Sequence, residues 1–166
     1  MKKLGRAGIN WLKSFHLLFA GLWLGAAVSL MILNAFVTGL PAQELHGLDR
    51  AMRFIDDFVI IPGAMGSLFT GLVYSLWTNW GFFTYRWVTV KWAITLFGVL
   101  FGTFFLGPWL NGMEEISGRI GGAALADPVY LHNKAMNMWG ALLQITGLAA
   151  AVSVSVIKPW GKRKRH

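Results

Sequence analysis

The chain contains no cysteine and few charged residues, and its acidic residues occur in only two segments. The absence of cysteine excludes disulfide bonds and thiolate metal sites, so any metal must be bound by histidine, methionine, lysine or oxygen ligands. Only 13% of the 166 residues are charged and 55% are apolar, which is too apolar for a soluble domain with one core. The composition therefore predicts a single domain that lies in a lipid bilayer.

Four apolar segments are long enough to cross a membrane. A hydrocarbon core about 30 Å thick requires about 20 apolar residues, each rising about 1.5 Å along a helix. The segments are residues 12–35, 58–77, 87–110 and 136–157. The first has too long an apolar run for a signal peptide and no clean cleavage site after it, so we expect it to be retained. We predict an all-α, multi-pass integral membrane protein, a bundle of four transmembrane helices.

The charges are sorted by connection, which predicts the topology. Eleven cations and no acidic residue precede the first segment, flank the link between the second and third, or follow the fourth: Lys2, Lys3, Arg6, Lys13, Arg86, Lys91, Lys158, Lys162, Arg163, Lys164 and Arg165. All seven acidic residues lie in the two other connections: Glu44, Asp49, Asp56, Asp57, Glu114, Glu115 and Asp127. The positive-inside rule places both termini in the cytoplasm. This sorting also argues against nucleic acid as the partner of the basic residues and favours membrane lipid.

The two outer connections differ in pattern. Within Pro41–Asp57, apolar residues recur at helical spacing opposite charged ones, which predicts an amphipathic helix at about residues 42–57 lying on the membrane surface. The second connection, Asn111–Ala135, is rich in glycine, and we expect it to be irregular.

His16 is the strongest functional signal, because it lies one turn inside an otherwise apolar segment. Ionisable residues at such a depth are costly and usually face the bundle interior. At about 100° per residue, His16 shares a helix face with Ala20, Trp23 and Ala27, and the two alanines leave a slot for a flat ring. The alternative is a histidine that is hydrogen-bonded to a backbone carbonyl near the interface.

Lys91 lies about as deep as His16, from another helix. Its face continues through Thr95, Gly98 and Gly102, so that a cation lies below a groove floored by glycines. This arrangement suits an anionic, planar ligand. The alternative is that Lys91 extends its ammonium group to the lipid phosphates.

The other candidate residues lie at different depths. Arg86 is at the interface, where it binds either anionic lipid or a ligand carboxylate. Met65 stands roughly 10–15 Å further from the cytoplasm than His16, which argues against both residues binding one iron. His132 and His46 are also on the outer side, His132 as a cap or a ligand and His46 as a surface residue.

Small residues recur every fourth position on three segments, which is the pattern of close helix packing in lipid. The stripes are Gly21, Gly25 and Ser29; Gly98 and Gly102; and Gly147, Ala151 and Ser155. Packing within the bundle is their simplest explanation, and they also offer faces for oligomerisation. No zinc motif, phosphate-binding loop, nucleophile motif or pair of carboxylates within the spans is present in the sequence.

The stretch Trp11–Gly25, with Lys13, His16 and Trp23, resembles the first span of HemJ-type protoporphyrinogen IX oxidases. Further elements agree in order: Pro62, Met65 and Gly71 in the second span, Arg86 and Lys91 opening the third, and Lys158-Pro159 closing the fourth. The run from Ile60 to Leu110 is more similar still to a related group of uncharacterised bacterial four-span integral membrane proteins. Two features depart from the HemJ pattern: the outer segments are longer and more polar, and Asn133–Asn137 lacks an Asn-Glu-x-Pro element.

The resemblance implies a haem b inside the bundle, with His16 as the iron ligand and Met65, Arg86 and Lys91 as essential residues. Trp23, Gly98 and Gly102 would then line the cofactor. It also implies a location in the bacterial cytoplasmic membrane. We expect a haem-binding membrane protein, with porphyrin-handling oxidoreductase activity of the HemJ type. The alternatives are a non-enzymatic haem carrier, sensor or assembly partner, and a small-solute transporter, for which we find no polar path.

Overall fold

The computed structural model describes residues 3–37 and 40–160, and within them all regular structure is helical. The α-helices are α1 Arg6–Phe36, α2 Leu45–Ile55, α3 Ile61–Trp77, α4 Arg86–Phe101, α5 Gly107–Ile120 and α6 Pro128–Ile157. The predicted cytoplasmic cations Lys2, Lys162, Arg163, Lys164 and Arg165 lie outside the described residues. The prediction of an all-α protein is confirmed.

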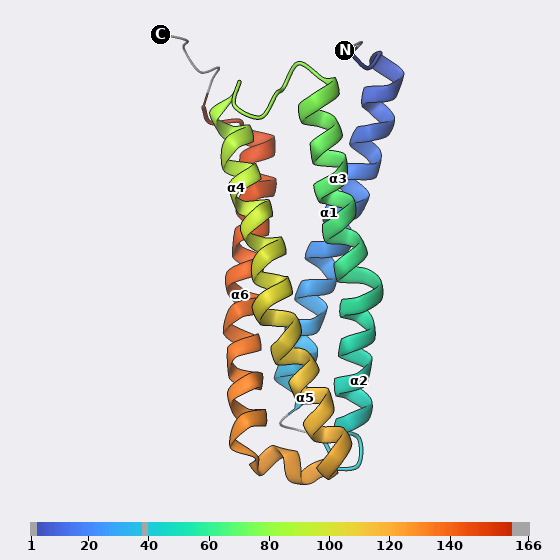
Figure 1. The fold of residues 1–166 in the computed structure, drawn as a ribbon, viewed down its shortest axis with the longest axis vertical. Coiled ribbons are helices and arrows are strands. Elements are labelled where there is room, and N and C mark those ends of the chain that lie inside the picture. The colour runs from blue at the N-terminus through green and yellow to red at the C-terminus, as the bar shows by residue number, and fades with distance from the viewer. Residues whose placement is uncertain (1–2, 38–39, 161–166) are drawn as a thin grey trace.

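Four helices are long and apolar enough to cross a membrane, because α2 continues into α3 and α4 into α5 (Figure 1). They are Arg6–Phe36, Leu45–Trp77, Arg86–Ala126 and Pro128–Ile157, and each contains one of the predicted spans. Large apolar side chains cover the outside of these helices: Phe58, for example, is 70% exposed and Phe104 is 66% exposed. Such a surface is consistent with a multi-pass membrane protein, whose outward face meets lipid instead of water.

A proline causes a local widening in each of the two composite helices. Pro62 and Pro108 have no N–H with which to bond the carbonyl four residues earlier. The preceding residues, Asp56–Ile60 and Gly102–Leu106, adopt π-helical turns, in which Ile61 N–H bonds the Asp56 carbonyl and Gly107 N–H bonds the Gly102 carbonyl. The helices therefore continue through the prolines with a wider turn.

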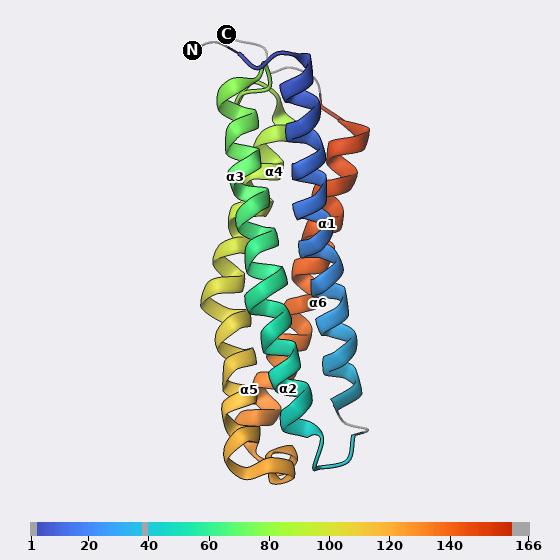
Figure 2. The ribbon, with the colours of Figure 1, turned by 90° about the vertical axis from the view of Figure 1, so that its right-hand side faces the viewer.

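The two ends of the molecule differ in charge. The basic end comprises the start of α1, the link between α3 and α4, and the end of α6, which lie together in Figure 1. Contacts hold this end together: Leu4 N–H bonds the Trp77 carbonyl at 3.0 Å, and the Lys158 ammonium lies 4.9 Å from the centroid of the Trp80 ring. The acidic end comprises α2, α5 and the 3-10 helix Gly121–Ala126, and the long helices connect the two ends (Figure 2).

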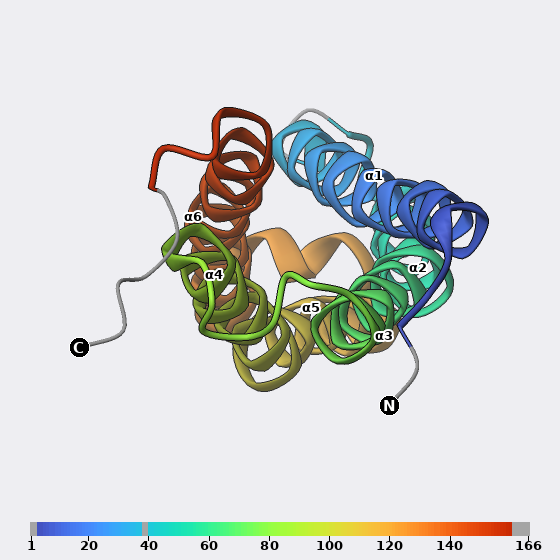
Figure 3. The same cartoon turned by 90° about the horizontal axis from the view of Figure 1, so that it is seen from above.

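The helices associate as two pairs. α1 packs closely on α3, and α4 packs on α6, as the view along the bundle in Figure 3 shows. The pairs meet where α1 contacts α6 and where α2 contacts α5, whereas α3 and α4 contact each other little. The bundle is therefore less tightly packed between α3 and α4 than between its other neighbouring helices.

Glycines set the closest approach between α1 and α3. A Cβ added at Gly63 would lie 3.0 Å from the Trp23 backbone nitrogen and 3.2 Å from the Phe19 carbonyl oxygen. By contrast, a Cβ added at Gly21 or Gly25 would meet nothing within 4 Å. The expectation that the Gly21–Gly25–Ser29 stripe packs inside the bundle is therefore wrong, and that face of α1 is open.

A hydrophobic core fills the acidic end. Its fully buried members include Val37, Leu45, Met52, Met113 and Tyr130, each at most 1% exposed. α2 packs on α5 and continues α3 at the acidic end.

Two predictions for the acidic end need correction. The predicted apolar stripe of α2 does face inward, but the prediction that this helix lies separately on the membrane surface is wrong. The expectation of an irregular segment at residues 111–135 is also wrong, since helices cover nearly all of it. At Gly121, a backbone φ of 54°, which glycine adopts without strain, ends α5 and turns the chain toward α6.

Candidate functional site

His16 is hydrogen-bonded to Thr70 across the α1–α3 interface. Its Nδ1 lies 2.7 Å from the Thr70 Oγ1. The Thr70 hydroxyl in turn donates to the Gly66 carbonyl at 2.6 Å, which uses its only hydrogen. In this arrangement the hydroxyl oxygen accepts from a protonated Nδ1, and the lone pair of the neutral imidazole is on Nε2; in the other tautomer Thr70 donates to Nδ1 instead. His16 thus has a side-chain partner, and the Ser67 backbone also acts on the same ring, so the alternative of a histidine that bonds a backbone carbonyl stays open.

Aromatic and small residues surround the imidazole. Its ring meets the Tyr74 ring edge to face, with 5.8 Å between centroids. A Cβ added at Gly71 would lie 3.9 Å from both the His16 Cε1 and the Trp92 Cζ2, so Gly71 lies between the two rings. One turn along α3 from Thr70, the Ser67 Oγ is buried and has no hydrogen-bond partner among the described residues. An orphan hydroxyl of this kind is a group that a polar guest or an ordered water satisfies.

The two predicted cationic residues differ in exposure. Lys91 is partly buried and lies near His16, whereas Arg86 is exposed at the start of α4. Within residues 3–37 and 40–160, neither side chain has a hydrogen bond or an ion pair. Both charges are therefore available to an anionic group near the basic end.

The remaining predicted residues line a cavity further along the bundle. Trp23, Met65, Gly98 and Gly102 surround a space of about 400 Å³ between α1, α3, α4 and α6. His16, Lys91 and Arg86 do not line it. Since Trp23 follows His16 by seven residues, the two levels are about 10 Å apart along α1. The structure thus divides the predicted site into two groups.

Trp23 and Gln144 form the boundary of this cavity. With its amide oriented so that both polar atoms are satisfied, Gln144 donates to the Gly98 carbonyl at 3.1 Å and accepts from the Trp23 Nε1 at 3.2 Å. A Cβ added at Gly98 would lie 3.2 Å from the Trp23 Cη2. Gly98 therefore makes room for the Trp23 ring, which is a packing role, whereas Gly102 faces open space with only Gln144 near it.

A polar network at the acidic end joins α2, α5 and α6, and sequence reasoning missed its buried part. The carboxylate of Asp49, which is 0% exposed, accepts from the Tyr130 hydroxyl at 3.1 and 3.2 Å. Asp49 follows Leu45 by four residues and precedes Met52 by three, so it lies on the apolar stripe. That spacing was the signal that it points inward.

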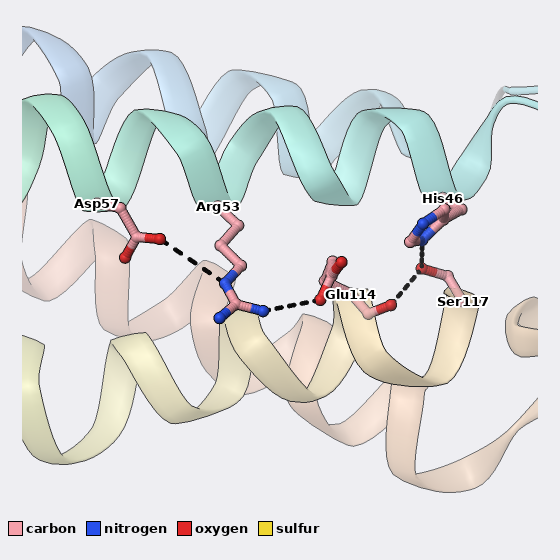
Figure 4. Close-up of polar contacts among 5 residues, drawn as sticks. All are labelled: His46, Arg53, Asp57, Glu114 and Ser117. Atoms are coloured by element: carbon pink, nitrogen blue, oxygen red, sulfur yellow. Dashed lines mark hydrogen bonds and ion pairs between the residues drawn. The ribbon is translucent and has the colours of Figure 1, made fainter. Parts of the chain in front are cut away.

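Figure 4 shows the part of the network that contains His46, Arg53, Asp57, Glu114 and Ser117. Arg53 donates to Glu114 at 2.9 Å and lies 3.7 Å from the Asp57 carboxylate, and His46 lies 3.5 Å from Ser117. The contacts of Arg53 with Glu114 and of His46 with Ser117 connect α2 to α5, whereas Arg53 and Asp57 belong to one continuous helix. Ion pairs of partly exposed side chains add little to stability. His132 is exposed. Among the described residues, no group of three or more histidine, cysteine, aspartate or glutamate side chains is placed to hold a metal ion.

Comparisons with protein-family models, curated proteins and solved structures find no match to the chain. The resemblance to HemJ-type oxidases accordingly stays a prediction from the residues that carry it.

Proposed function

We propose that the protein is an integral membrane protein that binds haem b, with His16 as a ligand of the iron. The observation that carries the proposal is the hydrogen-bonded series from His16 through Thr70 to the Gly66 carbonyl. Histidines that bind metals usually donate their other ring N–H to a protein acceptor, which fixes the ring orientation and the tautomer. A neutral imidazole with Nε2 free, held among apolar helices, is a normal iron ligand.

Charge near the basic end supports the same proposal. A haem carries propionates, and Lys91 and Arg86 have no anionic partner among the described residues. Lys91 is the better placed of the two, since it is partly buried and lies near His16. The groups that would meet a haem here are the imidazole, the Ser67 hydroxyl and the two cations without an anionic partner. The cavity lined by Trp23 and Gly102, called the outer cavity below, is not assigned to the macrocycle, because His16 does not line it.

The proposed setting is the bacterial cytoplasmic membrane, with the basic end in the cytoplasm. This orientation follows from the positive-inside rule applied to the cations of the basic end. Bound haem supplies one-electron chemistry, and the chain supplies the ligand, the charge partners and a largely apolar surrounding. The leading proposal for its activity is oxidation of a porphyrinogen, as in HemJ-type oxidoreductases. The alternative is a haem carrier or sensor.

The visible spectrum of the purified protein tests haem binding. We expect a Soret band in the protein as isolated or after addition of haem. His16→Ala should lose haem or shift the band, whereas His132→Ala, which removes an exposed histidine, should behave like the unmodified protein. A protein that contains no haem and takes up none overturns the proposal.

Thr70 tests the observation on which the proposal depends. Thr70→Val removes the acceptor for the His16 Nδ1–H and should weaken haem binding by about 10–100-fold. Thr70→Ser keeps the hydroxyl and should restore binding. If Thr70→Val and Thr70→Ser bind haem equally well, His16 does not bind the iron in the orientation seen here. Addition of a porphyrinogen to the haem-loaded protein then distinguishes an oxidase from a carrier.

A further inference from the structure

The outer cavity lies between the two π-helical turns. Residues of both turns line it, including Asp56 and Ile60 on one side and Gly102 and Leu106 on the other. π-helical turns are rare and frequently occur at functional sites. The cavity volume of about 400 Å³ is within the usual range of small-molecule sites, about 300–1,000 Å³. Two prolines thus produce a pair of irregular walls around a space of ligand size.

Most polar groups around this cavity have partners; Asn111 is exposed at its edge, and Asp56 is the charged group without a partner. The amides of Gln144 and Asn137 each bond neighbouring backbone or side-chain groups. The Thr103 hydroxyl donates to the Val99 carbonyl, and Asp57 lies against Arg53. The Asp56 carboxylate, by contrast, has no hydrogen bond or ion pair within the described part of the chain.

Asp56 points toward the far wall of the cavity. The Asp56 Oδ2 would lie 4.0 Å from a Cβ added at Gly107, on the opposite helix. Asp56 is only partly exposed. The nearest cation along α2 is Arg53, which is occupied by Asp57 and Glu114. The uncompensated charge that faces the cavity is therefore negative.

The position of the cavity along the helices indicates whether it opens to water or to lipid. Asp56 precedes Trp77 at the basic end by 21 residues, which corresponds to about 31 Å of helix, close to the full thickness of a hydrocarbon core. Ile61 and Met65 line the cavity and are 48% and 52% exposed on the outer surface of the molecule. The mouth therefore opens sideways, between α3 and α4, at the outer boundary between lipid tails and headgroups.

We propose that this cavity binds an organic cation with a bulky apolar body, whose charge pairs with Asp56. Such molecules concentrate at the boundary between lipid tails and headgroups, where their apolar part is in lipid and their charge is near water. The apolar walls accept the body, and an unpaired carboxylate at this depth is costly unless a cation compensates it. The site is distinct from the proposed haem site, because its lining excludes His16, Lys91 and Arg86.

Binding of tetraphenylphosphonium to the protein in lipid nanodiscs tests the proposal. We expect saturable binding by equilibrium dialysis, and much weaker binding of triphenylphosphine oxide, a neutral analogue. Asp56→Asn should weaken binding of the cation about tenfold or more, because it removes one charge-assisted contact. Glu115→Gln removes an exposed acidic residue of the same end that does not line the cavity, and it should leave binding unchanged.

A second variant tests the cavity without changing charge. The space beside Gly102 is open apart from the Gln144 side-chain amide at 3.8 Å, so Gly102→Leu places a side chain in the cavity without a backbone clash. It should weaken tetraphenylphosphonium binding while the helical content is kept.

Three results overturn the proposal: equal binding by Asp56→Asn and Glu115→Gln, equal binding of the neutral analogue, or no effect of Gly102→Leu. His16→Ala should lose haem and keep cation binding, so that failure of either proposal is recognised separately.

Discussion

The contact between α1 and α3 positions His16 against Thr70, and Gly63 is where α3 lies against the backbone of α1. Gly63→Ala would place a methyl group 3.0–3.3 Å from backbone atoms of Trp23 and Phe19. Backbone atoms of a packed helix do not rotate away, so α1 must shift outward. Overpacking of this kind costs about 1–3 kcal/mol.

Gly25→Ala provides the matched control, since Gly25 is also in a long helix and has nothing within 4 Å of its added Cβ. Alanine in place of glycine favours the helix by about 1 kcal/mol in both variants. This gain cancels in the comparison, so the free energy of unfolding of Gly63→Ala should be about 1–3 kcal/mol below that of Gly25→Ala. Relative to the unmodified protein, we expect a loss of up to about 2 kcal/mol for Gly63→Ala and a small gain for Gly25→Ala.

Reversible unfolding in mixed micelles with increasing dodecyl sulfate, followed by circular dichroism, measures both values. Haem uptake by Gly63→Ala is a second measurement, since a displaced α1 lengthens the hydrogen bond between His16 and Thr70. Equal unfolding midpoints for the two alanine variants would refute the assignment of Gly63 to a close backbone contact.

Two further predictions concern the acidic end and the topology. Tyr130→Phe removes the hydroxyl that donates to the fully buried Asp49 carboxylate and should destabilise the protein by about 1.5–3 kcal/mol in the same unfolding assay. Tyr85→Phe is its control, and equal stability of the two variants would mean that Asp49 does not depend on Tyr130. Fusions of reporter enzymes after residue 166 should be active only for the reporter that functions in the cytoplasm, and activity of the external reporter alone would reverse the orientation.

Sequence patterns were sufficient for the helices and insufficient for their ends. Apolar run length identified four long helices because the requirement to cross a bilayer is a simple length. The segment 111–135 was misjudged because its glycines suggested a loop, whereas Asp127 and Pro128 are a strong helix start. The Asp127 carboxylate accepts from the backbone N–H of Val129 at 2.8 Å and of Tyr130 at 2.9 Å. Packing against α2 and the core of the acidic end outweighs the low helix propensity of the glycines in this segment.

For the candidate site, the sequence was sufficient to predict that His16 lies inside the bundle, but not which residue it contacts. Helical spacing placed His16 inward, and the structure agrees, since it faces α3. The identity of Thr70 as its partner depends on the rotation of α3 relative to α1, which residue counting does not determine. The cavity could not be predicted from the sequence either, because it results from two π-helical turns that widen the helices just before Pro62 and Pro108. A turn of one extra residue changes which side chains face inward.

The core at the acidic end gives the protein two regions with different thermodynamics. A helix of 33 residues is about 50 Å long, so that Leu45–Trp77 extends beyond a hydrocarbon core of about 30 Å. The projecting part buries Leu45, Met52 and Met113 away from water, and it is stabilised by the hydrophobic effect with its large heat-capacity change. Within the bilayer the lipid is as apolar as the side chains, and packing and hydrogen bonds hold the helices together. On the proposed placement in the membrane, we expect urea and temperature to act first on the acidic end, before the helices within the bilayer separate.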